Sequence, residues 1–76
     1  MEIIQTELNN EGTPVNKAVV KHKGKFYLVS ESSKHGLETL IFPSDSEGKV
    51  TNWLEVGGGR GVKLHEVLAN FESELF

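Results

Sequence analysis

The chain has no cysteine among its 76 residues, and only two prolines, one tryptophan and one methionine. Without cysteine it can form no disulfide, thiolate nucleophile or thiolate metal site, so its core must depend on hydrophobic packing. No apolar run approaches the roughly 20 residues of a membrane-spanning helix, and the N-terminal MEIIQTEL lacks the basic flank of a secretory signal. These absences predict one soluble cytoplasmic domain, residues 1–76, with no membrane span.

The remaining composition is that of a small folded domain. With 37% apolar and 25% charged residues, the chain is too hydrophobic to be disordered, although a domain of this size buries only about 60% of its unfolded surface. The net charge of −3 is unevenly spread, since residues 1–11 carry only acids whereas residues 12–30 carry four lysines and no acid. Because the total is acidic, nucleic acid is not an expected partner, and the lysines are expected to be solvated charges on a strand edge.

Three β-strands are expected in the first 30 residues. The segments rich in β-branched residues are 2–8, 15–21 and 25–30, and a short helix stays open as the alternative for residues 2–8. His22-Lys23-Gly24 has the form of a three-residue hairpin loop in which Gly24 is left-handed and forms a G1 bulge. Counting outward from this loop, the core face carries Ala18, Val20, Phe26 and Leu28, and the outer face carries Val19, Tyr27 and Val29.

A second hairpin is predicted between Leu37 and Val56. Pro43 ends its first arm, and the tripeptide Ser46-Glu47-Gly48 repeats the loop chemistry of the first hairpin. With the same loop geometry, the core face carries Leu40, Phe42, Val50, Leu54 and Val56. Ile41 and Trp53 then face each other on the outer side as a cross-strand pair, which is itself a structural reason for the tryptophan.

One helix is predicted at the C-terminal end, where the apolar spacing changes from two to three and four. Its apolar stripe consists of Leu64, Val67, Leu68, Phe71 and Leu75. The stripe is long enough to pack on the Leu40 and Phe42 face of the second hairpin. The expected fold class is therefore α+β, a small antiparallel meander of four to five strands with one helix packed on one face.

The outer face is the first candidate site. It carries Tyr27, Val29, Ile41 and Trp53, and tyrosine and tryptophan are the residues most enriched at interface hot spots. We expect this face to bind a protein partner or a second copy of the chain. Two structural alternatives stay open, because the N-terminal strand or the loop of residues 31–36 could cover it.

The glycine run from Gly57 to Gly61 is the second candidate. Backbone N–H groups before a helix, with basic residues nearby, can bind a phosphate or carboxylate. The residues of this anion site would be Gly58, Gly59, Arg60, Gly61 and Lys63. The run is neither a P-loop nor a dinucleotide-binding motif, so a tight connection between strand and helix is the simpler interpretation.

No catalytic or metal-binding pattern is present in the sequence. His22, His35 and His65 match no zinc spacing, and we expect them to be surface histidines. The serines between residues 30 and 33 have no accompanying base or nucleophile motif. We therefore predict that the chain is not an enzyme and that it uses no cofactor and no metal.

The middle of the chain resembles a group of small uncharacterised proteins of tailed bacteriophages. The resemblance lies in GKFYLVS, Gly24 to Ser30, and in ETLIFPSDSEGKVTNWLEV, Glu38 to Val56. It is a structural pattern and implies no activity. It implies a setting, since small phage proteins often act in the host cytoplasm by stoichiometric binding to host or defence machinery.

Two functions follow as hypotheses. The first is a small cytoplasmic binding protein of phage or mobile-element type, which acts by stoichiometric protein–protein interaction, with host takeover or counter-defence as its role. The alternative is a protein that binds a small anionic ligand or a nucleotide through the Gly57–Gly61 loop.

Overall fold

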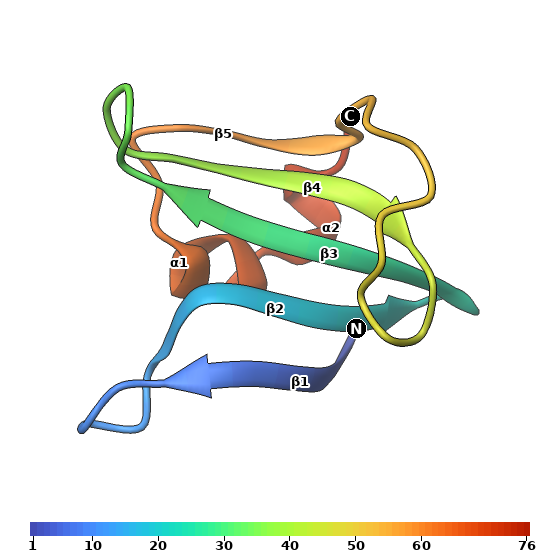
Figure 1. Cartoon of the computed structure of the whole chain (residues 1–76), viewed down its shortest axis with the longest axis horizontal. Coiled ribbons are helices and arrows are strands. Elements are labelled where there is room, and N and C mark those ends of the chain that lie inside the picture. Colours follow the sequence, from blue (N-terminus) through green and yellow to red (C-terminus); the bar gives the residue numbers. More distant parts are fainter.

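The computed structural model describes residues 1–76 and contains one five-stranded sheet with two short helices on one side (Figure 1). Each strand pairs antiparallel with the next along the chain, in the order β1-β2-β3-β4-β5. The strands are β1 (Glu2–Leu8), β2 (Pro14–His22), β3 (Lys25–Ser32), β4 (Glu38–Ser44) and β5 (Gly57–Arg60), and the helices are α1 (Leu64–Ala69) and α2 (Phe71–Glu74). The predicted α+β meander is confirmed.

The turn between β2 and β3 is shorter than the sequence count assumed. Lys23 and Gly24 both have positive φ angles, 51° and 79°, and His22 pairs directly with Lys25. This is a two-residue hairpin turn of the type I′ kind, whose twist matches that of the flanking strands. The predicted three-residue loop with a G1 bulge is wrong. Because the side-chain period of a strand is two, this shift by one residue reverses both faces of β3.

The core consequently lies on a different set of residues from the predicted one. Ala18 pairs with Val29, which pairs with Ile41, so these three side chains share one face, which we call the helix face. They are buried there with residues of the two helices: Leu64, Val67, Leu68 and Phe71. The assignment of Ala18 and Val20 to the core is right. Phe26, Leu28, Leu40 and Phe42 were assigned to the wrong face and lie on the other side, the open face.

The predicted helix is broken in two at Asn70, whose backbone angles of −128° and 36° are not helical. The apolar stripe is nevertheless correct, since Leu64, Val67, Leu68 and Phe71 are buried and Leu75 packs against the core. Neither helix is long and apolar enough to cross a membrane.

The second arm of the second hairpin is not a strand. After β4 only a single bridge joins Ser44 to Val50, and Thr51 N–H donates to the Pro43 carbonyl at 2.9 Å. Pro43 has no N–H to continue the ladder, and the chain leaves β4 as a long loop. Pairing resumes at Gly57, opposite Ile41. Trp53 and Leu54 therefore belong to a loop and do not alternate between two faces of a hairpin.

Candidate protein-binding surface

Three of the four residues predicted to bind a partner lie on the helix face. Val29 and Ile41 are 0% exposed, beneath the helices. Tyr27 is half-buried, and its ring packs edge-on against Phe71, with the ring centres 5.5 Å apart. The predicted surface of Tyr27, Val29, Ile41 and Trp53 is therefore wrong as a single face, because the shorter turn reversed β3 and carried β4 with it.

Trp53 is the predicted residue that does lie at the surface, since the residue is 74% exposed. Its ring contacts Phe42 edge-on, with the centres 5.3 Å apart and the planes at 64°. Phe42 lies on the open face, so Trp53 packs on a residue of the opposite side of the sheet from Ile41. The predicted cross-strand pair of Ile41 and Trp53 does not form.

The loop that carries Trp53 is held in shape at its beginning by Asp45. Asp45 Oδ1 accepts hydrogen bonds from the backbone N–H groups of Lys49 and Glu47, both at 2.9 Å. These bonds lower the pKa of the Asp45 carboxyl, which stabilises its charged form. The backbone closes the same turn, since Asp45 N–H donates to the Lys49 carbonyl at 2.9 Å. The loop thus begins with a fixed turn.

The loop also lies over part of the open face. Gly48 is so close to β2 and β3 that a Cβ atom placed on it would be 2.6 Å from a Val19 methyl group and 4.0 Å from Leu28. In Figure 1 the loop passes in front of the sheet, on the side away from the helices. This loop, and not the N-terminal strand or the loop of residues 31–36, therefore covers the second face of the sheet in part.

We use the name apolar corner for three exposed apolar residues, Trp53 and Leu54 of the loop and Phe76 at the C-terminal end. Leu54 is 74% exposed and Phe76 is 83% exposed. Phe76 N–H donates to the Val56 carbonyl at 2.9 Å, which holds the last residue beside the end of the loop (Figure 1). An open hollow of about 560 Å³ lies beside Phe76 and is also lined by Phe26, Pro43 and Val56. Leu54 was predicted to lie in the core, because the segment from Val50 to Val56 was expected to be a strand.

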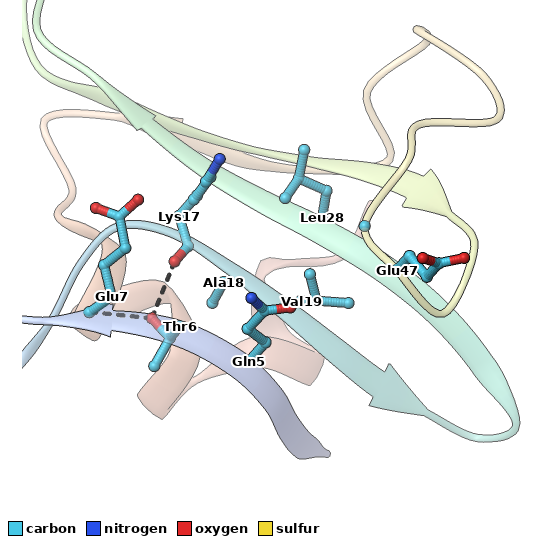
Figure 2. Close-up of a pocket in the computed structure, with 9 residues that line it drawn as sticks. Gln5, Thr6, Glu7, Lys17, Ala18, Val19, Leu28 and Glu47 are labelled. Carbon is cyan, nitrogen blue, oxygen red and sulfur yellow. Dashed lines mark hydrogen bonds between the residues drawn. The ribbon is translucent and has the colours of Figure 1, made fainter.

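A second hollow, of about 340 Å³, lies on the open face between β1, β2 and the loop (Figure 2). Val19 and Leu28 form its apolar part, and Glu47 and Gly48 line it from the loop. Gln5 and Glu7 rise from β1 on the same side as Lys17 of β2 (Figure 2). Thr6 Oγ1 donates to the Lys17 carbonyl at 2.9 Å, which ties the two strands together beneath the hollow.

The glycine run is a strand and not the predicted loop. At Gly57 a Cβ atom would collide with the Glu74 carbonyl and lie 2.8 Å from Ile41 Cδ1. Gly58 has a φ of 95°, and a Cβ there would collide with the Thr39 carbonyl. These two glycines are thus explained by close packing of β5 between β4 and the end of α2.

The backbone N–H groups at the start of α1, beside the predicted anion site, are already bonded to carboxylates of the chain. Leu64 N–H, at the start of α1, donates to Glu31 Oε2 at 2.7 Å. Lys63 N–H donates to Glu66 Oε1 at 3.1 Å. Arg60 is paired opposite Glu38 across the sheet. These hydrogen bonds and this strand pairing disfavour an anion site built on Gly58, Gly59, Arg60, Gly61 and Lys63.

His22 is buried and not the surface histidine that was predicted. Its ring packs edge-on against Phe71, with the ring centres 5.2 Å apart, and its Nδ1 atom has no hydrogen-bond partner. The two-residue turn explains this placement, because it makes His22 the last residue of β2 on the helix face. No group of three or more histidine, aspartate or glutamate side chains lies close enough to hold a metal ion.

Comparison of the chain with family models, with curated proteins and with solved structures gives no match.

Proposed function

We propose that the chain is a small binding protein that acts by stoichiometric protein–protein interaction, and that the apolar corner is its contact surface. The observation that carries this proposal is the exposure of two adjacent large apolar residues, Trp53 and Leu54, each 74% exposed. Large exposed apolar groups of this kind mark interaction sites, and tryptophan is among the residues that contribute most to binding free energy.

The shape of the loop supports the same proposal. The loop is held in one conformation before a partner binds. Three interactions hold it: the Asp45 turn, the hydrogen bond from Leu54 N–H to Asn52 Oδ1 at 3.0 Å, and the contact of Trp53 with Phe42. A surface that is already ordered loses less conformational entropy on binding. Trp53 is thus presented to a partner rather than folded into the core.

The biological setting is proposed from the resemblance to small phage proteins. A protein of that type acts in a bacterial cytoplasm on a host or defence protein, in host takeover or counter-defence. The chain offers no assembled acid, base and nucleophile to suggest chemistry on that partner, so its action is proposed to be binding alone.

The test is capture of a partner from a bacterial lysate by three forms of the chain. The wild type is compared with a Trp53→Ala, Leu54→Ala double variant and with a control, Lys34→Ala, His35→Ala, in the exposed loop between β3 and β4. We expect the wild type and the control to retain the same partner and the corner variant to lose it, with the same thermal stability for all three. Equal capture by the corner variant would contradict the proposal.

A further inference from the structure

The outer edge of β1 is a second exposed feature, distant from the apolar corner. β1 is at the end of the strand order and pairs only with β2, so its other edge has no neighbouring strand (Figure 1). Its side chains are exposed, including Ile3 at 42%, Ile4 at 44% and Leu8 at 60%. The opposite edge of the sheet is different, because Leu75 bridges to Gly57 beside β5. β1 is therefore the edge at which another strand can add.

The two sides of β1 differ in chemistry. Glu2 lies opposite Lys21 and Gln5 lies opposite Val19, so the side chains of Glu2 and Gln5 are on the open face. Glu7 follows Gln5 by two residues and lies on the same side (Figure 2). Ile3 lies opposite Val20 and is therefore on the helix face. A strand added to this edge would meet two acids on one side and an isoleucine on the other.

We propose that the outer edge of β1 binds an extended, basic strand of a partner protein. The strand would carry lysine or arginine at two positions that face Glu2 and Glu7, and apolar, β-branched residues on the alternate positions. The chain already contains a strand of this kind, since β2 presents Lys17 and Lys21 on the open face with Val20 between them on the helix face. On its paired side β1 already has one such contact, since Lys21 lies opposite Glu2, whereas Glu7 lies opposite Val15.

The charge of β1 also determines which strands it rejects. β1 carries Glu2 and Glu7 and no basic residue. A second copy of β1 would bring four acids to one pair of strands, and like charges across a sheet destabilise it. The register shift between Ile3 and Gln5, where Ile4 has no partner, further limits pairing with an arbitrary strand. The occupant is thus a basic strand of another protein and not a second copy.

The test uses a synthetic peptide with the sequence of residues 14–22, PVNKAVVKH, and the isotope-labelled full chain. We expect the peptide to change the amide signals of β1 in nuclear magnetic resonance spectra and to slow hydrogen exchange of its outward amides. A peptide with glutamate in place of both lysines should not bind. A peptide with proline in place of Val19 should also fail, since it keeps the charge but loses a backbone N–H donor.

Variants of the chain locate the site. Glu2→Gln, Glu7→Gln should weaken peptide binding roughly two- to tenfold, the range expected for two exposed cross-strand charge pairs. Glu55→Gln, Glu74→Gln makes the same change in net charge away from β1 and should leave binding unchanged, as should Trp53→Ala in the apolar corner. The proposal is overturned by no binding of PVNKAVVKH, by equal binding of the acidic or proline peptide, by equal weakening in the two double variants, or by signal changes centred outside β1.

Discussion

Gly57 and Gly58 show how single residues allow the last strand to fit between β4 and the C-terminal helices. Each stands where a side chain would meet backbone atoms, of Glu74 in one case and of Thr39 in the other. A sequence with several adjacent glycines suggests ligand binding because glycine also serves phosphate sites. Only the tertiary packing distinguishes the two uses, and here it assigns these two positions to the fold.

Gly58→Ala should lower the free energy of unfolding by about 1 to 3 kcal/mol, because an alanine there is strained at positive φ and collides with Thr39. Chemical denaturation measures the effect. Gly59→Ala is the matched control, since a Cβ at Gly59 has no atom within 4 Å. Equal losses in the two variants would show that close packing is not the reason for Gly58.

The ion pair between Lys23 and Glu72, with Nζ and Oε1 2.8 Å apart, predicts a pH effect on stability. The hydrogen bond and charge of Lys23 lower the pKa of Glu72. Its contribution is therefore complete above the ordinary glutamate pKa of about 4.3 and is lost as the pH falls through the lowered value.

Both side chains are exposed, so the effect on the melting temperature should be small. Thermal unfolding of wild type and Glu72→Gln should differ near neutral pH and converge in acid. A constant difference down to the most acid pH would rule out this pair as its source. Glu55→Gln, at an exposed acid without an ion pair, is the control.

At the scale of elements, the apolar spacing predicted β1 to β4 and the apolar stripe of the helices, whereas the turns determine which face of the sheet each side chain occupies. The stripe from Leu64 to Phe71 was recognisable because a period of three to four survives the break at Asn70. The register of β3 was not recognisable, because Lys23 is an uncommon residue at positive φ and Gly24 suits both a two-residue and a three-residue turn. Because the turn is one residue shorter than predicted, Val29 and Ile41 lie in the core and not on the predicted surface.

The carboxylate of Glu31 joins the sheet to the start of α1, and its removal should be costly for such a short helix. Glu31→Ala should reduce the free energy of unfolding by about 0.5 to 2 kcal/mol, the usual range for loss of a helix N-cap, because Leu64 N–H then loses its acceptor. Equilibrium unfolding in urea would show this, with Glu55→Ala as the control. A loss no larger than that of the control would contradict a capping role for Glu31.

At the scale of the whole molecule, one face of the sheet is closed by the helices and the other is covered only in part by the loop. The sequence indicated correctly that helix packs on one face of the sheet, and it placed Trp53 on a candidate binding surface. It could not indicate that Leu54 is exposed or that Phe76 lies beside Val56, because these features depend on the path of the loop and on the hydrogen bond from Phe76 to Val56. The candidate surface is thus a product of tertiary structure.

The proposed contact surface is tested most directly by the fluorescence of Trp53, the only tryptophan of the chain. The emission is measured while the chain is titrated with the partner captured in the lysate experiment. If the apolar corner is the contact surface, Trp53 loses its water on binding, and its emission should shift to shorter wavelengths and level off at a fixed stoichiometry. The partner should contain no tryptophan, or it should be labelled so that its own tryptophans do not contribute to the measured fluorescence. A complex that forms with the emission of Trp53 unchanged would contradict the account.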